Sequence, residues 1–194
     1  MDERDRGLQA RLVDVGVDLV TREGVQALTL REIARRAGVS HGAPRRYFPT
    51  HLDLLSAIAR QGFIDLAHRA TTAIAHTGTA PRTQIESVVR VYLDFARTER
   101  GMYELMFRHD LLESNRLQLR NTSLPLFGVF VDLVARARPS SATEPAVVAG
   151  ALWANLHGIA QLWGWGSLQL TTGSEDIEPL LRTVLDAHLG PEAR

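Results

Sequence analysis

The segment TLREIARRAGVSHGAPRRYF, residues Thr29 to Phe48, contains five arginines and one glutamate. The whole chain of 194 residues carries no net charge, so this segment concentrates positive charge. Thr29 and Glu32 have the spacing of a capping box, in which the two side chains bind backbone N–H groups at the start of a helix. We therefore predict that a helix begins at Thr29.

A turn that contains glycine follows the predicted helix. Gly38 breaks the helix, and Val39 supplies an apolar side chain that can be buried beside the turn. A second, short helix is predicted from His41 to Phe48, with Ser40 as its N-cap. Two short helices joined in this way, here over residues 29–48, are typical of a helix-turn-helix, whose second helix can enter the major groove of DNA.

The predicted second helix is composed of small, polar and cationic residues. Those that can approach bases or phosphates are His41, Gly42, Ala43, Arg45, Arg46 and Tyr47. The alternative is that the arginines of the whole segment form an ordinary solvated face, but the cap, the turn and the short helix around them favour DNA binding. Arg35 and Arg36 lie late in the first helix, and we expect these two to be solvated or salt-bridged.

Apolar residues recur at helical spacing along the rest of the chain, and no segment alternates as a strand would. The pattern predicts an all-α fold of about nine helices. Besides the two helices of the motif, these cover residues 8–23, 50–76, 84–98, 102–112, 116–138, 147–165 and 175–189, with a kink at Pro125 and with Ser174 as the cap of the last. The arginine-rich section ends near residue 50, so we predict two domains, 1–50 and 51–190.

The composition disfavours several classes of protein. No cysteine is present, which excludes disulfides and thiolate metal sites. The chain opens with MDERDRGLQARL, which is charged where an export signal needs an apolar run, and residues 146–165 are too polar for a membrane span. We therefore expect a cytoplasmic protein with no membrane contact.

The sequence shows no pattern of catalytic residues. It contains no G-x-S-x-G, no H-E-x-x-H and no glycine loop suited to phosphate. His109, Asp110 and Glu113 have a spacing that could hold a metal ion on a helix, but a solvated helix end is the interpretation we prefer. We expect no enzymatic activity, no cofactor and no metal site.

The order of the motifs is informative as a whole. A helix that ends in E-G is followed by T-L-R-E-I-A-R-R-A-G-V-S, then by G-A-P-x-x-Y-F-P, and then by L-x-L-L. Over residues 8 to 60 this order resembles the DNA-binding domain of TetR-type transcriptional repressors. The resemblance implies a homodimer whose three N-terminal helices read DNA, while the C-terminal helices bind a small effector and pair the subunits through the last two long helices.

The resemblance also implies which residues contact DNA. Thr29 falls at a helix cap that often touches phosphate, and the other positions that contact DNA in relatives are Arg31, Ser40, His41, Gly42, Ala43, Arg45, Tyr47 and His51. Many relatives have a tyrosine, a histidine and a lysine at positions 45, 47 and 51. A histidine is largely neutral near pH 7, so we expect a weak or pH-dependent phosphate contact at position 51.

In the C-terminal half, Trp153, His157 and Gly158 form a W-x-x-x-H-G pattern that resembles the penultimate helix of some family members. Trp153 and His157 lie on one helix face, where they could pack in the core, with a hydrogen bond to the imidazole, or form the wall of an effector pocket. Other aromatic and methionine residues at helical spacing could likewise pack in the core or line an effector pocket. The expected pocket residues are Tyr103, Met106, Phe107, Phe127, Phe130, Trp153 and His157.

The last two long helices are the expected dimer interface. The candidate residues are Val147, Leu152, Ile159, Trp163, Leu181, Val184, Leu185 and Leu189. Trp163 and Trp165 could instead line a ligand site, but we favour the interface or the ordinary core for them.

These features predict a ligand-responsive repressor that binds a pseudo-palindromic operator as a homodimer and is released by a small-molecule effector. The composition of the expected pocket favours an apolar or aromatic effector. Two alternatives stay open. One is an activator or a ligand-independent, nucleoid-type DNA-binding protein. The other is an all-α ligand carrier or enzyme whose helix-turn-helix resemblance is accidental.

Overall fold

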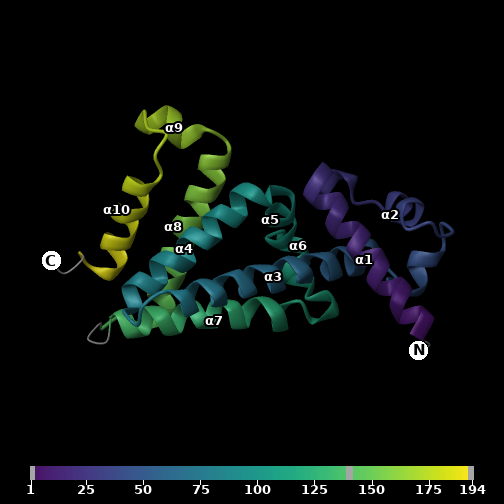
Figure 1. Cartoon of the computed structure of the whole chain (residues 1–194), viewed down its shortest axis with the longest axis horizontal. Coiled ribbons are helices and arrows are strands. Elements are labelled where there is room, and N and C mark those ends of the chain that lie inside the picture. The colour runs from purple at the N-terminus through teal and green to yellow at the C-terminus, as the bar shows by residue number, and fades with distance from the viewer. Residues whose placement is uncertain (1–2, 139–141, 192–194) are drawn as a thin grey trace. The chain divides into compact units, whose positions relative to one another are not determined.

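The computed structural model describes residues 3–138 and 142–191, and all of the regular structure within them is helical (Figure 1). The all-α prediction is therefore confirmed for these residues. The α-helices are α1 (Glu3–Glu23), α2 (Leu30–Arg36), α3 (His51–His76), α4 (Pro81–Thr98), α5 (Arg100–Met106), α6 (His109–Ser114), α7 (Arg120–Ala137), α8 (Pro145–Gly164), α9 (Ser167–Thr172) and α10 (Glu178–Leu189). The short 3-10 helices are η1 (Val25–Ala27), η2 (Ala43–Arg46) and η3 (Arg116–Gln118).

The chain divides into two compact units. The first contains the residues up to Ala67 together with Thr98–Pro125, and the second contains His68–Arg97 and the residues from Leu126 onwards. The first unit therefore holds the predicted helix-turn-helix together with α5 and α6, and the second holds α8, α9 and α10. Helices α3 and α7 contribute residues to both units.

In the first unit, α1 packs against α2 and α5. Leu12 and Leu19, on the apolar face of α1, are fully buried. Gly24 follows α1 with a φ of 81°, a conformation that glycine adopts without steric cost. Gly101 brings α5 close to the end of α1, because a Cβ atom at this position would collide with the carbonyl oxygen of Val20. The C-terminal end of α1, which precedes η1 and α2, is thus held against α5 by a close backbone contact.

In the second unit, α8 packs against α9 and α10. Leu152 and Leu156 of α8 and Leu181 and Leu185 of α10 are buried. Within the described ranges, no helix combines the length and the apolar character that a membrane span requires.

The predicted helix 102–112 is two helices in the structure. Helix α5 ends at Met106 and α6 begins at His109, because Arg108 adopts an extended conformation with φ −64° and ψ 127°. The guanidinium of Arg108 binds the carboxylate of Asp110 at 2.6 Å. The apolar spacing continues across this break, so the periodicity of the sequence did not reveal it.

The predicted helix 116–138 starts later than expected. Asn115, Leu117 and Gln118 have positive φ values of 48°, 52° and 55°, which are incompatible with a right-handed helix, and α7 begins only at Arg120. Pro125 lies inside α7, which continues beyond it to Ala137.

The C-terminal region also differs from the prediction. Ser174 does not cap the last helix; its hydroxyl accepts a hydrogen bond from the N–H of Asp176 at 3.0 Å in the preceding turn. Helix α10 begins at Glu178, where Pro179 occupies the first turn, a position that needs no N–H donor. Helix α9 was not predicted, because six residues between Gly166 and Gly173 are too few to show a period.

Candidate nucleic-acid interface

Helix α2 begins as the sequence predicts. The hydroxyl of Thr29 accepts a hydrogen bond from the N–H of Glu32 at 3.1 Å. The reciprocal half of the expected capping box is replaced by other bonds. The N–H of Thr29 donates to the carbonyl of Ala27 at 2.8 Å, and the carboxylate of Glu32 binds Arg35 and Arg36 instead.

The turn after α2 also agrees with the prediction. Gly38 has a φ of 65°, and the N–H of Val39 bonds back to the carbonyl of Ala34 at 3.0 Å. A left-handed glycine that closes a helix in this way satisfies carbonyls that would otherwise lack partners. The turn therefore redirects the chain toward the second element of the motif.

The predicted helix from His41 to Phe48 is wrong in its details, because only residues Ala43–Arg46 form a helical element, and this is the 3-10 helix η2. Pro44 is the physical reason. It has no N–H to bond the carbonyl of Ser40 across four residues, so that carbonyl accepts instead from Ala43 at 3.0 Å, the shorter 3-10 spacing. The side chain of Ser40 consequently does not cap the element as predicted.

The 3-10 helix η2 is held in place by buried side chains. Pro44 is buried and Phe48 is fully buried, and η2 packs against α2.

Helix α3 then starts with a reciprocal pair of bonds that we did not predict: Thr50 N–H donates to Asp53 Oδ2 at 2.8 Å, and Asp53 N–H donates to Thr50 Oγ1 at 3.2 Å. The T-x-x-D spacing in the sequence is the signal that could have identified this cap.

Asp53 is buried, and its charge is compensated locally. Burial by itself would raise the pKa of this carboxyl, but the hydrogen bonds from Thr50 and the nearby Arg116 outweigh it, so that the pKa is lowered. The carboxylate thus stays ionised and holds the start of α3, directly after the helix-turn-helix.

The five arginines of the motif fall into two groups. Glu32 binds Arg35 at 2.6 Å and Arg36 at 2.7 Å, and Arg36 also binds Glu23, so the salt-bridged interpretation of these two arginines is confirmed. Hydrogen bonds from Arg35 and then Arg36 lower the pKa of Glu32 to about 2.

The second group consists of Arg31, Arg45 and Arg46, which are exposed. No ion pair or hydrogen bond joins these three side chains to any other residue that the structure describes. Their charges are therefore available to an external anion, whereas those of Arg35 and Arg36 are already neutralised.

The remaining predicted contact residues lie between Thr29 and His51, within the first unit. Thr29, Ser40, His41 and Gly42 are exposed, and Ala43 and Tyr47 are half-buried. His51 is exposed as the first residue of α3, and its Nε2 lies 2.6 Å from the carbonyl oxygen of Leu28. This bond orients the imidazole and leaves Nδ1 as the nitrogen that a phosphate could reach.

The residues expected in an effector pocket divide between the two units. Tyr103, Met106 and Phe107 belong to the first, where the rings of Tyr103 and Phe107 are 5.0 Å apart. Phe127, Phe130, Trp153 and His157 belong to the second. There the ring of Phe127 lies 6.2 Å from Trp153, whose ring is 5.4 Å from that of His157. The expected pocket residues thus belong to two different units.

The cluster in the second unit includes a residue that we did not assign to it. The hydroxyl of Tyr92, on α4, lies 2.8 Å from Nδ1 of His157. His157 is half-buried, and burial lowers its pKa, which favours the neutral imidazole. The hydrogen bond expected for the core interpretation of His157 is therefore present.

Four of the residues expected at the dimer interface are already buried in the single chain and leave little surface for a partner: Leu152, Ile159, Leu181 and Leu185. Trp163, Val184 and Leu189 are half-buried, and Val147 is 61% exposed. Leu162 and Trp165 are also exposed on or directly after α8; Trp165 was expected at the interface or in the core, and Leu162 was not in the predicted set.

An N-terminal helix-turn-helix with exposed arginines, within an all-helical chain, defines the class of helix-turn-helix DNA-binding proteins. Comparison with known proteins agrees. Residues 12–58 match the bacterial regulatory proteins of the tetR family, and residues 85–188 match the tetracyclin repressor-like C-terminal domain. The chain belongs to the TetR family of DNA-binding transcriptional regulators.

The sequence identity between this chain and individual curated relatives is low. The nucleoid occlusion factor SlmA of Actinobacillus pleuropneumoniae serotype 5b (strain L20) is 27% identical over 120 residues, which cover 58% of this chain and 56% of SlmA. The chain thus spans about half the length of the curated relatives it matches.

Two solved structures are similar over nearly their whole length. A protein of unknown function from Rhodococcus sp. RHA1 has a TM-score of 0.79 at 25% identity, covering 94% of this chain and 93% of that one. The multidrug binding protein EbrR, solved in complex with imidazole, has a TM-score of 0.62 at 25% identity, covering 100% of this chain and 98% of EbrR.

Proposed function

We propose that this protein is a ligand-responsive transcriptional repressor that binds operator DNA in the cytoplasm as a homodimer. The observation that carries the proposal is the division of the arginines in the helix-turn-helix. Glu32 neutralises Arg35 and Arg36, whereas Arg31, Arg45 and Arg46 are exposed without an intramolecular partner among the residues described. If the arginines served only to make the surface soluble, no advantage would come from leaving Arg31, Arg45 and Arg46 without a carboxylate partner.

In the proposed complex, arginines bind phosphates through their planar fork and supply affinity that depends on salt. The small residues that precede and begin η2 approach base edges and supply sequence preference. The proposed DNA contacts are Thr29, Arg31, Ser40, His41, Gly42, Ala43, Arg45, Arg46, Tyr47 and His51. Two subunits would place their motifs about 34 Å apart, on successive major grooves of a pseudo-palindromic operator.

The proposed effector site lies in the second unit, at the cluster of Phe127, Trp153 and His157 with Tyr92. Aromatic rings offer contact area to an apolar or aromatic molecule, and the neutral His157 offers a polar atom. The likeness to EbrR, which binds multiple drugs, supports this choice of effector. An effector that binds one conformation of the dimer more tightly would shift the population away from the DNA-binding form.

For the homodimer we propose the outer faces of α8 and α10. Val147, Leu162 and Trp165 are large apolar residues exposed on or directly after α8. A contiguous patch of exposed apolar residues is typical of a surface that another protein covers. Val184 and Leu189 of α10 remain candidates because they are only half-buried in one chain.

The test is selection and sequencing of random DNA fragments bound by the purified protein, followed by titration of the selected site with small molecules. We expect enrichment of a pseudo-palindrome, and release of the DNA by an apolar or aromatic compound. Folded protein that enriches no sequence, even at low salt, would refute the proposal.

The relatives favour one second candidate, a DNA-binding protein of the nucleoid that needs no effector, because the similar SlmA proteins are nucleoid occlusion factors. The selected DNA distinguishes the two functions. A nucleoid protein would bind many sites across a chromosome, and no compound would release it. A repressor would bind few sites, next to the genes it controls.

A further inference from the structure

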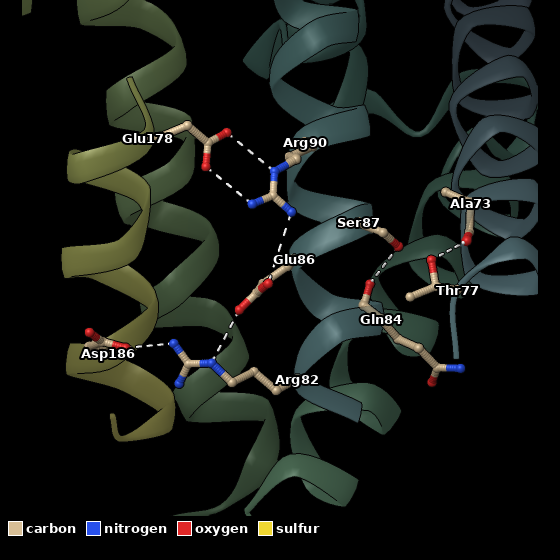
Figure 2. Close-up of polar contacts among 9 residues, drawn as sticks. All are labelled: Ala73, Thr77, Arg82, Gln84, Glu86, Ser87, Arg90, Glu178 and Asp186. Carbon is tan, nitrogen blue, oxygen red and sulfur yellow. Dashed lines mark hydrogen bonds and ion pairs between the residues drawn. The ribbon is translucent and has the colours of Figure 1, made fainter. Parts of the chain in front are cut away.

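In the second unit, Arg82 of α4 binds three acceptors at once, and Figure 2 shows two of them, Glu86 and Asp186. Its Nε donates to Glu86 on the same helix at 3.2 Å, and its NH2 group donates to Asp186 of α10 at 2.5 Å. Its NH1 group donates to the carbonyl of Gly190, the residue that ends α10. One guanidinium thus joins α4 to a side chain and to the backbone at the C-terminal end of α10.

A second ion pair joins the same two helices at the other end of α10. Arg90 binds Glu178 through two bonds of 3.2 Å and 3.1 Å, and Figure 2 shows Glu86 between the two arginines. Arg90 and Arg82 are eight residues apart on α4, as are Glu178 and Asp186 on α10. Eight residues are slightly more than two helical turns, so each pair of side chains lies on one side of its helix, and the helices run antiparallel.

The charges also match the helix ends. Glu178 lies in the first turn of α10 and Arg82 binds the carbonyl of Gly190 directly after its C-terminal end, the arrangement that the helix dipole favours. The two pairs differ in exposure: the side chain of Arg82 is 19% exposed, and that of Arg90 is 53% exposed. Because exposed pairs contribute little, Arg82 is the residue whose loss has the larger effect.

These contacts determine the rotation of α10 about its axis. Leu181 and Leu185 are buried on one side, and Glu178 and Asp186 lie beside them on the side that faces α4. The opposite side carries Leu180, Thr183, Val184 and Ala187, which are half-buried or exposed in the single chain. A small rotation of α10 would replace part of this outer face with charged residues.

We propose that Arg82 is a positioning residue for subunit pairing, which holds α10 so that Leu180, Val184 and Ala187 face a second copy of this chain. The inference rests on the proposed homodimer. Arg82 acts through α10 and makes no contact with the partner itself. Its role needs the arginine fork, because the three acceptors lie in different directions around the guanidinium.

The test compares Arg82→Gln with Arg97→Gln. Arg97 lies on the same helix but pairs with Asp94 of that helix at 2.8 Å, so it is a matched control. Dimer dissociation is measured by sedimentation velocity over a range of concentrations, and hydrogen exchange is measured for residues 178–189. We expect Arg82→Gln to raise the dissociation constant at least about tenfold and to speed exchange in α10. Arg97→Gln should change neither.

Should Arg82→Gln fail to fold, Asp186→Ala serves as the second variant, because it removes one acceptor and leaves Arg82 in place. A weaker dimer with unchanged exchange in α10 would mean that Arg82 lies in the interface itself, and would overturn the positioning role. An unchanged dimer would overturn the inference while the proposed repressor stands. A wild-type chain that is monomeric at every concentration would refute both the proposed homodimer and the inference.

Discussion

At the scale of single residues, Glu32 determines which arginines of the helix-turn-helix are paired within the protein. It lies three residues before Arg35 and four before Arg36, and side chains at these spacings meet on a helix. Arg31 is its immediate neighbour in sequence and points elsewhere. The pairing of Arg35 and Arg36 with Glu32 was open to prediction from the sequence, because it depends on spacing within one helix.

Replacement of Arg45 by alanine should weaken binding to every DNA sequence, because the side chain is proposed to contact phosphate. We expect the slope of log affinity against log salt to fall in magnitude by about 1. Fluorescence anisotropy over a salt series measures both quantities. Arg35→Ala is the control, since Glu32 already binds that arginine. Wild-type affinity and slope in Arg45→Ala would contradict the assignment.

The carboxyl of Glu32 should titrate with a midpoint of about 2, because hydrogen bonds from Arg35 and Arg36 lower its pKa from 4.5. A lowered pKa in the folded state means that the pairing stabilises the fold above pH 4.5, and that this contribution is lost as the pH falls toward 2. The side-chain carbon shift of Glu32, followed by NMR from pH 6 to 2, measures the midpoint. An ordinary midpoint near 4.5 would show that the pairs do not persist in solution.

At the scale of elements, the ends of helices were harder to predict than their existence. Capping by Thr29 and the reversal at Gly38 depend on neighbouring residues and were predicted correctly. The extended conformation at Arg108 and the positive φ values from Asn115 to Gln118 interrupt helices where the apolar spacing continues. Periodicity reports which side of a helix is buried, and it carries no information about such breaks.

Gly101→Ala should destabilise the protein by about 1–3 kcal/mol, because the added methyl group collides with the backbone of Val20, which cannot move away as a side chain could. The free energy of unfolding in urea measures the change. Gly128→Ala is the matched control. Gly128 lies within α7 with no atom within 4 Å of an added Cβ, and its replacement should stabilise the protein by about 0.5–1 kcal/mol. Equal stability of the two variants would argue against close packing of α5 on α1.

At the scale of the whole molecule, the proposed repressor would respond at its DNA-binding site to a ligand bound at another site. The candidate DNA contacts lie in the first unit, and the cluster around His157 lies in the second. Helix α3 begins directly after the helix-turn-helix and contributes residues to both units. We therefore expect variants of the cluster to change the response to an effector without a comparable change in the affinity for DNA.

His157→Leu should shift the effector concentration for half-release of DNA by about tenfold or more, because it removes the polar atom that pairs with Tyr92. Anisotropy of labelled operator DNA during titration with the effector measures this shift. His76→Leu is the control, since His76 is exposed at the end of α3. Identical induction curves for wild type and His157→Leu would exclude a role in the effector site.

The sequence by itself determined the helical class, the helix-turn-helix with its cap and glycine turn, and the separation of paired from unpaired arginines. All of these depend on residues within a few positions of one another. Only the tertiary structure decided that Leu152 is buried and Val147 exposed, because α8 is mostly apolar and its few polar residues do not mark one outer face. It also decided that Arg82 meets Asp186, since packing alone brings together side chains separated by 104 residues.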